Sequence, residues 1–142
     1  NDAIAVNDQM VNAVDKCTKA ENTFFETCAT YNPAKIDAAL KERTTVCKQV
    51  KTELDGEKVH EKFATFKETT QHLVSTYVSL EKDYVEYARL YSIPTDSFTT
   101  EDEKQTSATA GKITDTLNKE YEAFKATQKE VSEAYDYKIT KY

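Results

Sequence analysis

The sequence predicts an all-α protein, an antiparallel up-down-up-down four-helix bundle with a longer hairpin between the third and fourth helices. Three observations favour this fold class. The 142 residues include only two glycines and two prolines, so there are few points at which a helix must end. Apolar side chains recur at intervals of three and four residues, as on one face of an α-helix. No segment shows the period-two alternation that is typical of a half-buried strand.

The first helix is expected at residues 2–31 and the second at residues 33–54. Asn32 and Pro33 separate them, because asparagine is a favoured N-cap and proline suits the first position of a helix. Gly56 is expected to end the second helix in the left-handed conformation. The apolar stripe of the first helix consists of Ala3, Val6, Met10, Ala13, Cys17, Ala20, Phe24 and Tyr31. The stripe of the second helix consists of Ile36, Leu40, Arg43, Cys47, Val50 and Leu54.

The third helix is expected at residues 57–92 and the fourth at residues 100–142. The third helix ends before Pro94, because the residue that precedes a proline is biased away from helical geometry. The segment IPTDSFTT forms the only loop of any length, and Thr100 to Glu103 has the pattern of a capping box. Short connections make antiparallel neighbours the default, so residues 1–142 are expected to form a single helical-bundle domain.

The unequal helix lengths predict that one end of the bundle is thinner than the other. At about 1.5 Å per residue, the third and fourth helices span about 54 and 64 Å, whereas the second spans about 33 Å. Residues from about 84 to 110 are therefore expected to project as a two-helix hairpin. Tyr84, Tyr87 and Tyr91 would lie on its inner face, and they are the candidate binding surface. The alternative is that these tyrosines fill a core whose edge stays in contact with water.

The three cysteines permit one intrachain disulfide in this topology, between Cys17 and Cys47. Both lie fifteen residues from Asn32, so they should be at the same height on facing helices. Cys17 and Cys28 are about 16 Å apart along one helix, which is too far for a bridge. A Cys17–Cys47 bridge would close a loop of about 31 residues and add about 3–4 kcal/mol to stability. The alternative is three reduced core cysteines. Cys28 is expected to be a packed thiol beside Phe24, with an intermolecular bridge as the minority option.

Two further positions have a structural and a functional interpretation. Arg43, which lies within the apolar stripe of the second helix, is expected to extend outward to solvent or to pair with an acid such as Glu21. The small residues from Ser107 to Gly111 should lie level with Tyr84 and Leu80, where they allow either close packing or a ligand cleft. Close packing is the preferred interpretation.

The residue patterns of an enzyme are missing from the sequence, so no catalytic residue, metal or cofactor is expected. His60 and His72, the two histidines, lie about 120° apart around one helix and do not converge. Glu57 and His60 have the Glu-x-x-His spacing of di-iron bundles, but a second copy of that motif is lacking. The net charge of −6 without a basic stripe argues against nucleic acid as a partner. No apolar run approaches the roughly 20 residues of a membrane span.

Three stretches of the chain are similar to a known family. NDAIAVNDQMVNAVD, KFATFKETTQHLVSTYVSLEKDYVEYARL and LNKEYEAFKATQKEVSEAY resemble exported bacterial surface lipoproteins of unknown function, a leptospiral-type surface-protein family. The resemblance implies an all-helical domain that is exported to the periplasm or cell surface and anchored by a lipid tether upstream of Asn1. An oxidising compartment of this kind agrees with a disulfide between Cys17 and Cys47.

The expected function is that of a non-enzymatic exported envelope or surface bundle, a protein-interaction or structural module. Its expected partner is an unknown protein or envelope component. The alternative is a small-ligand or carbohydrate binder that uses the tyrosine-rich surface. The chain begins at Asn1 without Met. A removed signal peptide, a lipid-attachment tether and a cloning choice all agree with that beginning.

Overall fold

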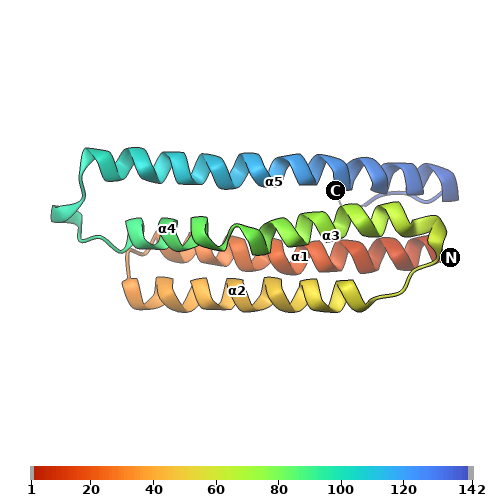
Figure 1. Ribbon diagram of the computed structural model, residues 1–142, viewed down its shortest axis with the longest axis horizontal. Helices are drawn as coiled ribbons and strands as arrows, with labels where there is room; N and C mark the ends of the chain where they lie inside the picture. Colours follow the sequence, from red (N-terminus) through yellow and green to blue (C-terminus); the bar gives the residue numbers. More distant parts are fainter. Residues whose placement is uncertain (1, 141–142) are drawn as a thin grey trace.

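The computed structural model describes residues 2–140, and within that range the regular structure is entirely helical. The α-helices are α1 (Asp2–Cys28), α2 (Pro33–Gly56), α3 (Ala64–Ser79), α4 (Glu81–Tyr91) and α5 (Thr100–Tyr135). Two 3₁₀ turns, η1 (Glu61–Phe63) and η2 (Thr95–Ser97), lie in the connections. Figure 1 shows the helices side by side along the long axis, with α5 running the length of α3 and α4. The predicted all-helical class is confirmed, although the described residues form five α-helices rather than four.

The beginnings of α2 and α5 follow the predicted capping chemistry. The side chain of Asn32 accepts a hydrogen bond of 3.1 Å from the backbone N–H of Lys35, and Pro33 is the first residue of α2. At α5 the capping box consists of Thr99 and Asp102, one residue earlier than predicted. The Asp102 N–H donates to Thr99 Oγ1 at 3.1 Å, and the Thr99 N–H donates to Asp102 Oδ2 at 3.0 Å. These bonds satisfy N–H groups that the helix itself cannot pair.

Two predicted helix ends and one predicted end conformation are wrong. The first helix ends at Cys28, three residues early, and Tyr31 adopts a left-handed conformation with φ of 55° in the turn to α2. Gly56 is the last residue of α2, and the predicted left-handed glycine does not occur there. The last helix ends at Tyr135, because Asp136 has a φ of 52° that ends regular helix geometry. Residues 141–142 of the predicted helix lie outside the described residues.

The predicted helix at residues 57–92 is divided into four pieces. Residues 57–60 are not helical, and η1 follows them, with His60 Nδ1 accepting a hydrogen bond from the Lys62 N–H. A turn at Leu80 separates α3 from α4. Near this turn the hydroxyl of Ser79 donates to the carbonyl of Thr76 at 2.9 Å. Such hydroxyls compete with the backbone for helix carbonyls and favour a helix end.

The predicted projecting hairpin at residues 84–110 is wrong over α4. The non-helical residues 57–60 carry the chain past the end of α2 before α3 begins, as Figure 1 shows. The whole α3–α4 segment is therefore displaced toward the N-terminal end of α1. As a result, Tyr31 in the α1–α2 turn stacks on Tyr91 at the end of α4, with ring centroids 5.7 Å apart. Only the loop with η2 and the beginning of α5 extend beyond that turn.

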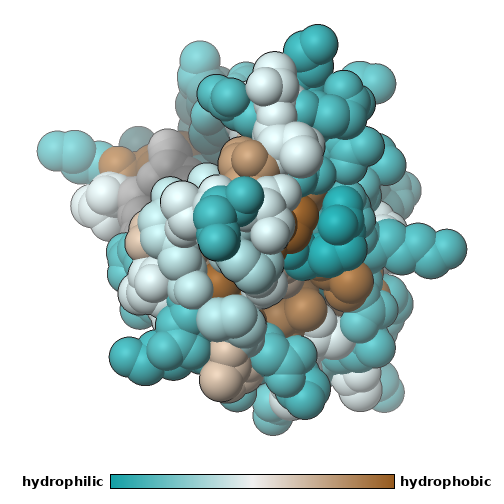
Figure 2. Space-filling view, turned by 90° about the vertical axis from the view of Figure 1, so that its left-hand side faces the viewer, coloured by the Kyte–Doolittle hydropathy of each residue, from teal (hydrophilic) through white to brown (hydrophobic). Residues whose placement is uncertain are grey.

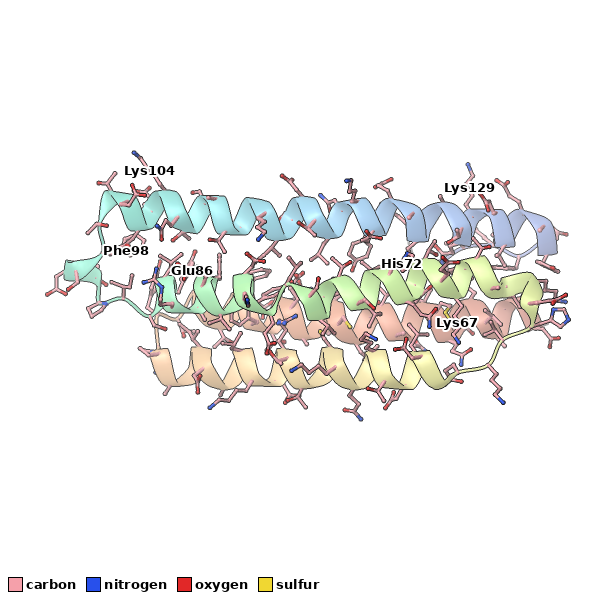
Figure 3. All side chains as sticks on the ribbon, viewed as in Figure 1. Lys67, His72, Glu86, Phe98, Lys104 and Lys129 are labelled. Carbon is pink, nitrogen blue, oxygen red and sulfur yellow. The ribbon has the colours of Figure 1, made fainter. Side chains whose placement is uncertain are left out.

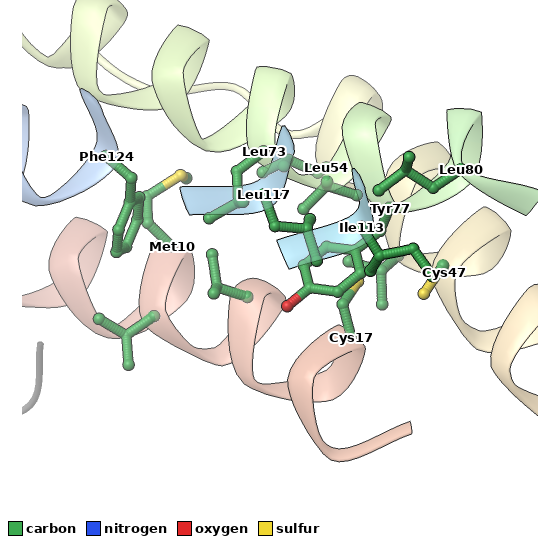
Figure 4. Close-up of a cluster of buried hydrophobic side chains, with 14 of the residues drawn as sticks. Met10, Cys17, Cys47, Leu54, Leu73, Tyr77, Leu80, Ile113, Leu117 and Phe124 are labelled. Atoms are coloured by element: carbon green, nitrogen blue, oxygen red, sulfur yellow. The ribbon is translucent and has the colours of Figure 1, made fainter. Parts of the chain in front are cut away.

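The buried apolar side chains of the α-helices form one continuous core. Figure 4 shows part of it, with Met10 and Cys17 of α1, Leu73 of α3 and Phe124 of α5 among the labelled side chains. Lys104 and Lys129 extend from α5 away from the other helices (Figure 3). Within residues 2–140, no helix combines the length and the apolar character that crossing a membrane requires. The polar residues that are buried within the core are Arg43, Thr70, Thr127 and Gln128.

Candidate functional site

A groove lies at the end of the molecule where α4, η2 and the beginning of α5 meet the α1–α2 turn. We call it the tip groove. Its volume is about 460 Å³, within the range of roughly 300–1,000 Å³ that is usual for small-molecule pockets. Figure 2 views the molecule from this end and shows small apolar areas between hydrophilic ones. The residues that line the groove are Tyr31, Leu90, Tyr91, Ile93, Thr95, Phe98, Glu103, Thr106 and Ser107.

A column of aromatic rings supports one side of the tip groove. Tyr31 stacks on Tyr91, which in turn stacks on Tyr87 with ring centroids 4.7 Å apart. Tyr87 contacts Phe25 of α1 edge-on at 5.0 Å, so the column continues into the core. Tyr31 is nevertheless 66% exposed, and Phe98 on the η2 loop is 39% exposed. Large apolar rings that are held in place but open to water are typical of contact surfaces.

The left-handed backbone conformation of Tyr31 is unfavourable in free energy. A non-glycine residue in the left-handed region loses roughly 1 kcal/mol, and such residues cluster at functional sites. Tyr31 adopts this geometry in the turn after α1, and its ring stacks on Tyr91 at the end of α4. The ring is therefore a fixed part of the groove wall.

The structure places the three residues of the predicted binding surface, Tyr84, Tyr87 and Tyr91, on α4, and Tyr91 is the one of them that lines the tip groove. Tyr84 is completely buried against Phe24, with ring centroids 5.7 Å apart in an edge-on contact, so it cannot take part in an exposed surface. Tyr87 and Tyr91 are half-buried. Sequence reasoning missed Tyr31 and Phe98, although a tyrosine directly before Asn-Pro and a phenylalanine in a polar loop were visible signals.

A second feature, the Arg43 cluster, lies inside the core and consists of Cys17, Glu21, Arg43, Cys47, Tyr77 and Tyr84. Arg43 is completely buried, and the prediction that it extends to solvent is wrong. Its Nη1 donates to the carbonyl of Tyr77 at 3.0 Å, and the guanidinium carbon lies 3.8 Å from the centre of the Tyr84 ring. The Tyr77 carbonyl is in the last turn of α3, where carbonyls lack helical partners and the helix dipole favours a cation.

The buried guanidinium is incompletely hydrogen-bonded. Among the described residues, neither Nε nor Nη2 of Arg43 has a hydrogen-bond partner. Leaving a buried donor unpaired costs about 1–3 kcal/mol, and more when the group is charged. The attraction between the cation and the Tyr84 ring offsets about 2 kcal/mol of this when the pair is desolvated.

Glu21 of α1 supplies a carboxylate near this cation. The hydroxyl of Tyr84 donates to Glu21 Oε2, so Tyr84 connects Glu21 to the guanidinium that lies on its ring. Burial raises the pKa of Glu21, whereas the Tyr84 hydrogen bond and the charge of Arg43 lower it by less. The acid that the sequence named for Arg43 is therefore nearby, and its link to the arginine passes through Tyr84.

Cys17 and Cys47, the predicted disulfide pair, are brought together in the Arg43 cluster. Both are completely buried and present as thiols, and they lie close enough for each to shift the pKa of the other. The interaction between the two thiols raises the pKa of Cys17 and lowers that of Cys47, and Arg43 lowers the pKa of Cys47 further. Arg43 Nη1 is 3.7 Å from Cys47 Sγ. The bridge itself stays a prediction.

The remaining cysteine and the histidines do not join either feature. Cys28 is buried, and burial raises its pKa to about 12. His60 caps η1 through its ring nitrogen. Within residues 2–140, no group of three or more His, Cys, Asp or Glu side chains has an arrangement that could hold a metal ion.

No protein-family model, curated protein or solved structure matches this chain.

Proposed function

We propose that this protein is a non-enzymatic, exported envelope or surface module that binds another macromolecule through its tip groove. In this proposal the helices act as a rigid, antiparallel up-down-up-down bundle that holds the tip groove away from the membrane, and a lipid tether upstream of Asn1 anchors the chain. The partner is a protein or other component of the envelope.

One observation carries the proposal, namely the exposed aromatic rings held in place at the end of the bundle. Tyr31 is 66% exposed although its ring stacks on Tyr91, and Phe98 is exposed beside it. Aromatic side chains supply large contact areas at low entropic cost, which is why they are enriched at interfaces. Glu103 is the one carboxylate in the groove lining, and that lining includes no histidine, cysteine or lysine that could act with it as a nucleophile or base.

The cellular location in this proposal rests on the resemblance of three long stretches of the chain to exported surface lipoproteins. The contact between Cys17 and Cys47 is an independent observation that fits an oxidising compartment. Fractionation of cells that express the full natural gene, followed by protease treatment of intact cells, tests this part. Recovery of the protein only from the cytoplasm would contradict it.

The binding part can be tested by placing a photo-crosslinking amino acid at one position at a time. Phe98 is the test position, and Lys129, whose side chain is 73% exposed, is the matched control. Figure 3 shows these residues near opposite ends of the molecule. Illumination of intact cells should give a discrete crosslinked species from position 98 and none from position 129. Equal crosslinking from both positions would contradict a binding site at the tip groove.

A carbohydrate-binding function is the second candidate, because the groove combines stacked tyrosine rings with hydroxyl and carboxylate side chains. Sugars bind proteins through an aromatic face together with polar groups that fix their orientation. Titration with envelope oligosaccharides, followed by the NMR signals of the Tyr31 and Phe98 rings, separates the two candidates. Saturable shifts confined to these rings would favour the carbohydrate function, and unchanged shifts would favour a protein partner.

A further inference from the structure

The starting point is the charge of Arg43, which lies in the core with few partners. Its Nη1 reaches the Tyr77 carbonyl and the sulfur of Cys47, while Nε and Nη2 are unpaired among the described residues. In the reduced chain, a nearby anion would stabilise a buried cation of this kind. Two side chains in the Arg43 cluster could supply it, and these are Glu21 and Cys47.

Cys47 is the better placed of the two. Its sulfur is 3.7 Å from Nη1, within reach of the guanidinium, and the neighbouring Cys17 thiol lowers its pKa as well. Glu21 already accepts a hydrogen bond from Tyr84, whose ring lies against the guanidinium, and burial disfavours its ionised form. The thiolate is the reactive form of cysteine, and neighbouring arginines stabilise it.

We propose that Cys17 and Cys47 become joined by a disulfide in the mature protein, that Cys47 is the thiol that attacks the oxidant, and that Arg43 is the positioning residue that holds Cys47 as a thiolate until the bridge forms. This inference concerns the folding and maturation of the chain. It does not depend on what the tip groove binds.

The positions of the residues explain how a buried pair can be oxidised. Cys17 and Cys47 are both 0% exposed, so an oxidant cannot reach them in the folded protein. Arg43 and Cys47, however, are four residues apart on α2, and side chains with this spacing are neighbours on a helix surface. The contact between Arg43 and Cys47 can therefore form as soon as α2 is helical, before α1 and α3 cover it. Oxidation then belongs to folding, with Cys17 arriving when α1 packs on α2.

The reaction is a thiol–disulfide exchange with a disulfide oxidant, either a small-molecule disulfide or an oxidoreductase. The Cys47 thiolate attacks one sulfur of the oxidant, forms a mixed disulfide and releases one thiolate, which takes up a proton. Cys17 then loses its proton to solvent, attacks the Cys47 sulfur and displaces the second thiolate. Two protein thiols are oxidised by two electrons in total, and one disulfide is reduced to two thiols.

Peptide mapping tests the pairing. Trypsin places each cysteine in a separate peptide, with Cys17 in residues 17–19, Cys28 in residues 20–35 and Cys47 in residues 44–48. The full chain is refolded with glutathione disulfide, its remaining thiols are alkylated, and it is digested without reduction. Residues 17–19 should be linked to residues 44–48, while residues 20–35 carry the alkyl group. A bridge that includes Cys28, or alkylation at all three cysteines, would overturn the proposal.

Single-cysteine chains test the order of attack. In a Cys28→Ala background, Cys17→Ala leaves Cys47 alone and Cys47→Ala leaves Cys17 alone. Mass spectrometry then follows the mixed disulfide with glutathione during refolding. For each tenfold excess of the thiolate fraction of Cys47 over that of Cys17, Cys47 should react about threefold faster than Cys17. The gain is less than tenfold because the nucleophilicity of a thiolate falls as its pKa falls. In denaturing guanidinium chloride the two rates should become equal, since α2 is then unfolded. Equal rates during refolding would overturn the role of Cys47.

Two substitutions test the role of Arg43. Arg43→Lys retains a cation and should preserve most of the advantage of Cys47, whereas Arg43→Met should bring its rate down to that of Cys17. An advantage of Cys47 that survives in Arg43→Met would overturn the role of the arginine. If Arg43→Met does not refold, as judged by circular dichroism, Arg43→Lys decides the point. In Arg43→Lys, the ratio of the Cys47 rate to the Cys17 rate should then change with pH as expected for a cation beside a thiolate. A pH-independent ratio would refute the proposal.

Discussion

Substitution of Phe24 by alanine tests whether α4 is packed against α1, as the structure shows, or projects beyond it. Phe24 lies on α1 and is completely buried. Its ring contacts Phe25, Tyr84 and Tyr87, with centroid separations of 5.5, 5.7 and 6.0 Å. Two of these three rings belong to α4. The loss of stability in Phe24→Ala therefore reports the packing between α1 and α4.

The expected loss of stability in Phe24→Ala is large in relation to the total free energy of unfolding. Truncation of a buried phenylalanine to alanine costs about 3–5 kcal/mol, because apolar surface is lost and a cavity remains. Each lost aromatic pair adds about 0.5–1.5 kcal/mol beyond the area effect, so a result near the upper end is expected. A domain of this size is stable by only about 5–15 kcal/mol. The melting temperature should fall by about 10–20 °C.

Urea unfolding followed by circular dichroism, with all variants fully reduced, measures this loss. Phe98→Ala is the matched control, since it removes the same side chain from an exposed loop and should change stability by less than about 0.5 kcal/mol. A loss below about 1 kcal/mol for Phe24→Ala would refute the packing of α4 on α1. Hydrogen exchange gives a second measure, in which amides of α4 should be protected like those of α2 and residues 92–99 should exchange faster.

Three further outcomes are expected. Burial raises the pKa of Glu21 in the folded protein. The protein therefore loses stability as the pH rises above the pKa of about 4.5 that Glu21 has in the unfolded chain. Glu21→Gln should therefore be more stable than the wild type in urea at pH 7 and equally stable below about pH 4, and a constant difference would contradict the direction of the shift. The free energy of unfolding of the oxidised protein should exceed that of the reduced protein by about 3–4 kcal/mol, and Cys17→Ala should abolish that difference. Elemental analysis of untagged protein should show well under one equivalent of zinc, iron or manganese, and a stoichiometric metal whose removal by EDTA unfolds the chain would contradict this.

The parts of the fold that depend on local chemistry could be predicted from the sequence. Asn32 and Pro33 begin α2 as expected, because capping needs only residues within one turn of each other. The periodic apolar residues of α1 and α2 are mostly buried for a similar reason, since spacing determines the face of a helix on which a side chain lies. The contact between Cys17 and Cys47 follows from a short turn that fixes the register of α1 against α2.

The parts that depend on tertiary partners could not be predicted. Arg43 is buried because the Tyr77 carbonyl and the Tyr84 ring, more than thirty residues away in the sequence, receive its guanidinium. Periodicity placed Arg43 on the apolar stripe of α2, but the general behaviour of arginine favoured exposure. The Tyr77 carbonyl to which Arg43 donates lies in the last turn of α3.

The axial position of α3 and α4 is what determines the candidate site, and four residues control it. An extended residue advances the chain by about 3.3 Å and a helical residue by about 1.5 Å, so residues 57–60 advance it about 7 Å farther than a helix would. Periodicity along a stripe is insensitive to such a change, because the buried face of each helix stays the same. Moving α4 along the bundle nevertheless brings Tyr91 level with Tyr31 and leaves Phe98 beyond both. The tip groove is thus assembled from the α1–α2 turn, the end of α4 and the η2 loop, three segments that no local pattern connects. A deletion within residues 57–60 should separate Tyr31 from Tyr91 without altering any residue of the groove.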